Sequence, residues 1–388
     1  WLARRGAATR SALWAVLVPA AAMHAVATLL PLSDDVHRYA VEGAQLLHGE
    51  NPYAVAPAAT RALDAAELPG SVNHASMTSI YPPPMLGLHA WAWHVADALQ
   101  GFRVLALGAL AALVAGVLAL LAANRARPTL AVAVAWNPVL VLFAAGEAHH
   151  DVVAASVLVL AFVALQHRLA RTAIALAAGA AMLKPFAPAA LPARLAATSW
   201  RHLWIPPVLA LAAYLPFADA GYGLIASLVA FGGDMQFHGA LEPMLRGFAP
   251  WLPAFADPRV VRTTLLVLLA AGTVWLLRRS DGERPESRAA RATALLLLCL
   301  PTLHPWYFTL LVALLPFTNS RAMLAWTVAA PVYWLHGVAI GADGAWAEWS
   351  WATSLAHLPF VLWMLAEAFG PLRVREPRAG AEAVARHA

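Results

Sequence analysis

The sequence has little charge and a single cysteine. Of its 388 residues, 12% are charged and 61% are hydrophobic, whereas an ordinary soluble domain carries about 25% charged residues. The lone Cys299 excludes a disulfide framework and a cysteine-rich metal site. The sequence contains neither a Walker-type glycine loop nor a dinucleotide fingerprint, and no internal repeat is visible. The net charge of +5 does not indicate nucleic-acid binding, because the arginines fall in short loops between apolar segments.

What the sequence does have is a series of apolar runs of about 20 residues, which predicts an all-α, polytopic membrane protein. The runs cover residues 11–32, 103–122, 129–146, 151–167, 172–196, 203–217, 260–277, 292–303, 305–318, 322–340 and 351–369. The first run is long for the core of a signal peptide, so we interpret it as an uncleaved span.

Two segments affect the expected number of transmembrane helices. Lys184-Pro185 interrupts the 172–196 run, which could therefore be two half-helices. Residues 83–99 contain His89, His94 and Asp97 and are interpreted as a re-entrant or interfacial segment. Between about 11 and 13 transmembrane helices are expected.

Arginine and lysine mark the cytoplasmic side of a membrane protein. The arginine-rich loop 278–291 and the basic tail 371–388 are therefore expected in the cytoplasm, and both termini with them. We interpret residues 1–370 as one transmembrane domain, with a first extracytoplasmic loop at 33–82, carrying amphipathic helices, and an outer loop at 218–259. The unusual polar clusters then all fall on the outer side.

The first of these clusters contains two adjacent carboxylates, Asp34 and Asp35, directly after the first apolar run. Charge is costly where a hydrophobic helix leaves the membrane, and it usually carries function. The alternative is that Ser33, Asp34 or Asp35 only caps the next helix. A carboxylate here could take a proton from a hydroxyl as a general base.

Helical spacing places Asp35, Tyr39 and Glu42 on one face. Asp34 and Arg38 are also four residues apart and could form only a surface pair. Gly49 is expected to end this helix, and Pro52 in Asn51-Pro52-Tyr53 favours an extended exit.

A second cluster consists of Glu147, His149, His150 and Asp151. These side chains could bind a divalent metal, or they could form neutral hydrogen bonds to a phosphate or a sugar. The residues alone leave both readings open, and we do not favour the metal.

Cationic candidates follow further along the chain. Lys184 lies at the end of an apolar stretch, where it must extend to the interface or meet an anion, and we favour the anion. His304 is a candidate for a phosphate contact, whereas Trp306 and Tyr307 could be interfacial belt residues. Arg246 could hold a phosphate as a bidentate donor or only add charge at the membrane surface.

The order of these motifs resembles a known family. Ser33-Asp34-Asp35-x-x-Arg38-Tyr39, Gly49-x-Asn51-Pro52-Tyr53, Asn73-His74 and Ile80-Tyr81-Pro82-Pro83 resemble the first outer loop of bacterial GT-C glycosyltransferases. Within them, the resemblance is to the polyprenyl-phosphate-mannose-dependent mannosyltransferase branch. Trp136-Asn137-Pro138 with Glu147-x-x-His150-Asp151, then Lys184-Pro185 and Pro305-Trp306-Tyr307, resemble its later motifs, so that the likeness covers about residues 33–319.

This resemblance implies a GT-C-like bundle in the bacterial inner (cytoplasmic) membrane. It implies inverting transfer of a sugar, mannose in this branch, from a polyprenyl monophosphate donor to a hydroxyl of a lipid- or glycan-linked acceptor on the extracytoplasmic face. No cofactor is expected. The catalytic carboxylate would be Asp35, with Asp34 as the alternative. Ala148-His149-His150-Asp151 and Ala40-Val41-Glu42 depart from the pattern of relatives and leave the sugar and acceptor open.

The remaining site residues combine the candidates found from the residues themselves with those that the likeness implies. The donor phosphate would be bound by Lys184, His304, Arg246 and His150. The substrate-binding residues would be Arg38, Tyr39, Glu42, Asn51, Tyr53, Asn73, His74, Tyr81, Glu147, His149, Asp151, Trp306 and Tyr307. The alternative function is a transporter or flippase of a polar lipid or small solute, in which intramembrane charges would serve translocation; the absence of a repeat weakens it.

Overall fold

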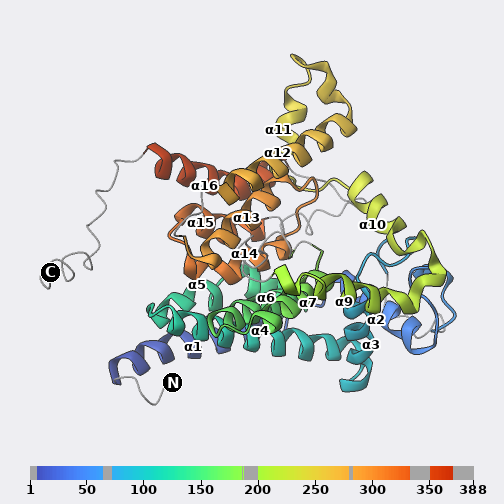
Figure 1. Cartoon of the computed structure of the whole chain (residues 1–388), viewed down its shortest axis with the longest axis horizontal. Coiled ribbons are helices and arrows are strands. Elements are labelled where there is room, and N and C mark those ends of the chain that lie inside the picture. The colour runs from blue at the N-terminus through green and yellow to red at the C-terminus, as the bar shows by residue number, and fades with distance from the viewer. Residues whose placement is uncertain are drawn as a thin grey trace, which may run out of the picture.

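The computed structural model describes residues 7–63, 72–185, 187, 200–278, 283–332 and 350–369. Across these residues the chain is helical (Figure 1), and the β contacts are isolated bridges that join Phe237 and His238 to Thr302. The predicted all-α polytopic membrane fold is confirmed. Parts of the predicted loop 278–291 and the tail 371–388 lie outside the described residues, and the proposed domain limits remain a prediction.

The first half of the chain forms the helices that surround the predicted site. They are α1 (Ala7–Ala27), α2 (Asp34–Leu47), the 3₁₀ turn η2 (Pro57–Ala59), α3 (Pro83–Val95), α4 (Ala98–Ala123), η3 (Pro128–Ala131), α5 (Val132–Ala135), the π-helical η4 (Leu140–Gly146), α6 (Asp151–Gln166) and α7 (Ala170–Leu183).

The second half is more broken. It contains η6 (Trp200–His202), α9 (Ile205–Tyr214), η7 (Leu215–Ala220), α10 (Gly223–Asp234), α11 (Glu242–Gly247), η8 (Pro253–Ala256), α12 (Pro258–Arg278), α13 (Pro285–Cys299), η9 (Pro305–Phe308), α14 (Thr309–Leu314), η10 (Leu315–Phe317), α15 (Arg321–Ala329) and α16 (Ser350–Phe369).

Within the described residues, three helices are long and apolar enough to cross a membrane: 9–27 of α1, 99–123 of α4, and α12. Two bent pairs, α5 with η4 and α9 with α10, raise this number to five. This is fewer than the 11 to 13 expected from the apolar runs. Proline and polar residues end several helices before they reach the length of a span, so that runs such as 151–167 appear as shorter apolar helices.

Two helix breaks at prolines are present, one at Pro138 and the predicted one at Pro185. The helix that precedes Pro138 and the helix that follows it meet at 66°, because proline cannot continue the hydrogen-bonding ladder; Asn137 bonds Thr327 instead (2.9 Å). Helix α7 ends at Leu183, and Lys184 before Pro185 is extended, as residues before proline tend to be. Residues 186 and 188–199, with the second part of the interrupted run, lie outside the described residues.

The core is formed by α4, α6, α7 and α14, and helices α2 and α3 pack beside them (Figure 1). A Cβ at Gly43 of α2 would lie 2.6 Å from the carbonyl oxygen of His89 in α3, so that this glycine permits the two helices to approach closely. Residues 83–99 are thus a packed helix, α3, and the start of α4. This close packing holds the acidic start of α2 against the bundle.

Candidate active site

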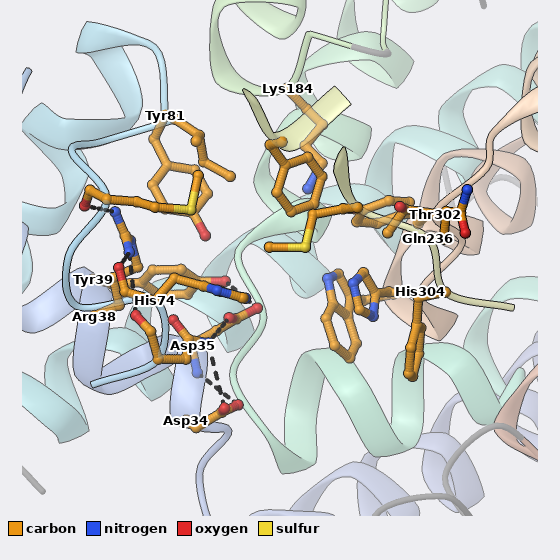
Figure 2. A pocket seen from close by; sticks show the side chains of 18 residues that line it. Asp34, Asp35, Arg38, Tyr39, His74, Tyr81, Lys184, Gln236, Thr302 and His304 are labelled. Carbon is orange, nitrogen blue, oxygen red and sulfur yellow. Dashed lines mark hydrogen bonds between the residues drawn. The ribbon is translucent and has the colours of Figure 1, made fainter. Parts of the chain in front are cut away.

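One cavity of about 410 Å³ brings together residues from distant parts of the chain. Figure 2 shows Asp34 and Asp35 on one side of it, His304 on the other and Lys184 above. The predicted residues that line it are Asp34, Asp35, Arg38, Tyr39, Asn73, His74, Tyr81, Lys184, His304, Trp306 and Tyr307. A volume of this size is typical of small-molecule sites.

The start of α2 separates the roles of its two carboxylates. Ser33 is the N-cap, and the backbone N–H of Asp35 donates to Ser33 Oγ (3.2 Å) and to Asp34 Oδ1 (3.0 Å). Capping by Ser33 and Asp34 satisfies backbone donors that a helix start leaves unpaired. The capping interpretation therefore holds for Ser33 and Asp34, whereas the carboxylate of Asp35 remains available to the cavity.

Asp35 is surrounded by three polar side chains. Asn73 Nδ2 donates to Asp35 Oδ1 at 2.5 Å, and the hydroxyl of Tyr39 donates to Oδ2 at 3.5 Å. His149 Nδ1 lies 3.6 Å from the same Oδ2. Burial, and next the charge of Asp34, raise the pKa of Asp35 to about 6, while the hydrogen bond from Asn73 opposes them. A carboxylate with this pKa is ionised at neutral pH and is more basic than an exposed one.

Arg38 connects α2 to the loop that follows it. It does not pair with Asp34, as its spacing allowed; its Nε bonds the buried Glu42 at 2.9 Å. The rest of its guanidinium donates to the carbonyl oxygens of Asn73, His74, Met77 and Thr78 at 2.8 to 3.2 Å. Since Asn73 contacts Asp35, these hydrogen bonds hold the loop over the candidate base.

The opposite wall carries one lysine and a row of stacked rings. Lys184 Nζ lies 2.8 Å from Asp151 Oδ1 and 4.5 Å from the centre of the Tyr307 ring. The His304 ring stacks between Phe237 (4.7 Å) and Trp306 (4.5 Å). Trp306 in turn stacks on His149 at 3.8 Å. An anion in the cavity would thus meet Lys184 and the His304 ring on this side.

The Glu147–Asp151 cluster lies behind the cavity wall, and its side chains diverge. His149 faces Glu147 and Asp35, His150 Nδ1 lies 3.1 Å from His89 Nε2, and Asp151 pairs with Lys184. Among the described residues, no three His, Cys, Asp or Glu side chains converge as metal ligands would.

Several predicted residues contact one another and do not line the cavity. Asn51 donates to Asp219 Oδ1 (2.7 Å) and connects the segment after α2 to the segment before α10. The hydroxyl of Tyr53 donates to the carbonyl oxygen of Tyr81 (2.5 Å). Arg246 lies on α11, where it pairs with Glu242. These residues, with Glu42, His149, His150, Glu147 and Asp151, are not part of the lining.

The cavity also has lining residues that the sequence did not single out as site residues: Met77, Ile80, Phe231, Met235, Gln236, Phe237 and Thr302. Met77 and Ile80 lie between the predicted Asn73 and Tyr81, so their position in the sequence could have identified them as lining residues. The others come from the end of α10 and from the segment that pairs with it, where Phe237 donates to Pro301 and accepts from Leu303 through the backbone (3.1 and 2.7 Å). No local sequence pattern predicts that residues near 237 and residues near 302 lie side by side.

Comparison with known proteins adds one match. Residues 1–200, about half of the chain, match the MptA_B family, described as alpha-(1->6)-mannopyranosyltransferase, N-terminal domain. The matched part includes the Asp34–Asp35 pair and Lys184, whereas His304 lies beyond it. No protein with curated annotation matches the chain.

Proposed function

The chain belongs to the MptA_B family of alpha-(1->6)-mannopyranosyltransferases, and on that premise we propose how this mannosyltransferase works. The donor is a polyprenyl monophosphate mannose, and the acceptor is a hydroxyl of a lipid- or glycan-linked substrate. Transfer inverts the anomeric centre and takes place on the extracytoplasmic face of the bacterial inner membrane. The scheme calls for no metal or other cofactor.

The observation that carries this proposal is that the cavity has the carboxylates of Asp34 and Asp35 on one side, His304 on the other and Lys184 above (Figure 2). In an inverting displacement, the base that activates the nucleophile and the leaving group lie on opposite faces of the sugar. Asp35 on one wall, with Lys184 and His304 across the cavity, has this polarity.

In the proposed reaction, Asp35 takes the proton of the acceptor hydroxyl as its oxygen attacks the anomeric carbon. The bond from that carbon to the phosphate oxygen breaks, and polyprenyl phosphate leaves with the electron pair. Lys184 and His304 stabilise the charge on the departing phosphate, as positioned cations and donors do at developing charge. Arg246, which pairs with Glu242 outside the cavity, has no part in this scheme.

The placement of arginines supports an extracytoplasmic cavity. Helix α6 begins at Asp151 beside the cavity, and α7 ends at Lys184, which lines it. The far ends of these two helices are joined through Arg168 and Arg171. Because arginines gather in cytoplasmic loops, the cavity end is the outer end, and both termini are proposed to be cytoplasmic.

The test is transfer from a labelled polyprenyl-phosphate mannose in membranes that contain the Asp35→Asn variant. We expect a rate loss of about 10²- to 10⁴-fold, the usual contribution of a general base. Asp34→Asn, whose neighbour Ser33 still caps α2, is the matched control and should retain most of the activity. Full turnover in both variants would contradict the proposal.

A further inference from the structure

Behind the candidate base, His149 lies between two carboxyl groups. Its Nε2 is 3.1 Å from Glu147 Oε2, and its Nδ1 is 3.6 Å from Asp35 Oδ2. His149 is 1% exposed and Glu147 3%, so that solvent does not compete for the contact between them. The geometry forms a row from Glu147 through His149 to Asp35.

The His149 ring has little freedom to turn elsewhere. It stacks on Trp306 with a centroid distance of 3.8 Å and an angle of 15°. Its backbone N–H donates to Phe143 at 2.9 Å, and Ala148 before it has a positive φ of 61°, a conformation that a non-glycine residue rarely adopts. Within the described residues, the buried Nδ1 has no hydrogen-bond partner at normal distance, and Asp35 is the acceptor that it faces.

The protonation states of Glu147 and His149 fit donation from Glu147 to His149 and from His149 to Asp35. Burial, and next the charges of Lys184 and His304, lower the pKa of His149 well below its usual range, so the ring is neutral. Burial, and next the charges of Asp35 and Asp34, raise the pKa of Glu147 to about 9. A protonated Glu147 donates to Nε2, and the ring proton of a neutral histidine then stands on Nδ1.

We propose that Glu147 and His149 are positioning residues for the base: Glu147 selects the tautomer of His149, and His149 donates from Nδ1 to Oδ2 of Asp35. The proposal rests on the proposed function, since it takes Asp35 as the base. The donor stabilises the ionised carboxylate and fixes its rotation toward the acceptor hydroxyl. The 3.6 Å contact shortens when substrate closes the cavity, as catalytic contacts often do.

Other charged groups around the row stay in place when His149 is changed. Asp35 also faces Asp34 on its own helix, Asp151 of α6, Lys184 after α7, and the Tyr39 hydroxyl. His304 faces His149 from the opposite wall. A change in the pH profile of a His149 variant therefore reports the loss of its own donor.

The test is the pH dependence of mannosyl transfer at saturating donor and acceptor, which reports the pKa of the base in the substrate complex, where the contact is short. The wild type should rise through a midpoint at or below about pH 6, because the base acts in its ionised form, the pKa of Asp35 is about 6 without a hydrogen bond from His149, and that donor lowers it further. His149→Phe keeps a ring on Trp306 but has no donor, so its midpoint should move up by about one pH unit. Below both midpoints, that shift is about a tenfold loss of rate.

Conservative variants should restore the wild-type profile. His149→Asn places an amide N–H close to the position of Nδ1, and Glu147→Gln can still donate to Nε2. Both are expected to keep a midpoint near that of the wild type, whereas Glu147→Leu should shift it as His149→Phe does. His24→Phe is the matched control, since His24 is a buried histidine that bonds Ala135 in another part of the bundle; its midpoint should stay unchanged.

Two outcomes separate the two proposals. An inactive Asp35→Asn together with a wild-type midpoint in both His149→Phe and Glu147→Leu would overturn the positioning role and leave the base in place. A fully active Asp35→Asn would overturn both. If His149→Phe folds too poorly to assay, the Glu147→Leu and Glu147→Gln pair decides the matter by the same shift.

Discussion

The two walls of the cavity are held in place by different forces. On the first wall, formed by α2 and residues 72–81, one buried guanidinium ties a loop to a helix through four carbonyl oxygens. On the second wall, formed by residues 231–237 and 302–307 with Lys184, rings of Phe237, His304 and Trp306 stack in a row. The first wall is a hydrogen-bonded frame, and the second is largely a packed aromatic surface.

This difference indicates that the two walls have different roles in the reaction. Hydrogen bonds have strict distances and directions, so that the first wall fixes the position of the proposed base relative to Asn73. Stacked rings tolerate small sliding motions at little cost, so that the second wall can adjust to a sugar and a phosphate. Changes to the first wall should therefore act on folding and on all substrates, and changes to the second should act mainly on rate.

The largest effect is expected from Arg38→Met. It leaves Glu42, which is 0% exposed, as an uncompensated buried carboxyl, and it removes the donor for four carbonyl groups. Loss of one partner of a buried pair costs about 3 to 5 kcal/mol. We expect a strong fall in the thermal unfolding temperature of the detergent-solubilised protein and loss of mannosyl transfer.

A double variant separates the effect of Arg38 on stability from its effect on the position of the loop beside Asp35. Arg38→Met with Glu42→Leu replaces the pair by apolar side chains, a change that is often neutral for stability. It should recover much of the unfolding temperature, yet activity should stay low because the loop that carries Asn73 is no longer tied to α2 by the guanidinium. Full activity in the double variant would show that the frame is not needed for the reaction.

A smaller effect on folding, with a clear effect on rate, is expected on the second wall. Lys184→Gln combined with Asp151→Asn removes the cation and its 2.8 Å partner together, so that no charge is left buried alone. Loss of one positioned donor at developing charge lowers the rate constant by about 10²- to 10³-fold. Rapid-mix measurement of the transfer step would detect this loss.

Lys184→Arg provides the matched comparison, because it keeps the positive charge beside Asp151. Its rate should lie between those of the wild type and the double variant, since the planar guanidinium has a different reach. If the neutral double variant transferred mannose at the wild-type rate, Lys184 would not be a phosphate ligand. The second wall would then not act through the positive charge of Lys184.

The first wall could largely be predicted from the sequence, because its signals are local. A serine and two aspartates after an apolar run predicted a helix start, which is present at the start of α2. The partner of Arg38 was not predictable, because both Asp34 and Glu42 lie four residues away. Arg38 pairs with Glu42 because a buried carboxylate needs a cation beside it, whereas Asp34 is exposed to solvent.

The second wall could be predicted only in part. His304, Trp306 and Tyr307 were found because they lie where two apolar runs meet, but the segment that carries Phe237 reaches this region through contacts about 65 residues apart in the chain. Arg246 was predicted to bind phosphate on its residue type alone. Its position on α11 pairs it with Glu242, four residues earlier, and it does not line the cavity.

The smallest effect is therefore expected from Arg246→Gln. Glu242 loses its partner, so the unfolding temperature should fall slightly, and the rate of mannosyl transfer should stay within about twofold of the wild type, as for most substitutions away from a site. Arg246→Gln with Glu242→Gln should restore the unfolding temperature. A tenfold loss of rate in both variants, with normal stability, would instead mean that α11 moves onto the cavity when donor binds. The second wall would then include the guanidinium of Arg246 in addition to Lys184 and His304.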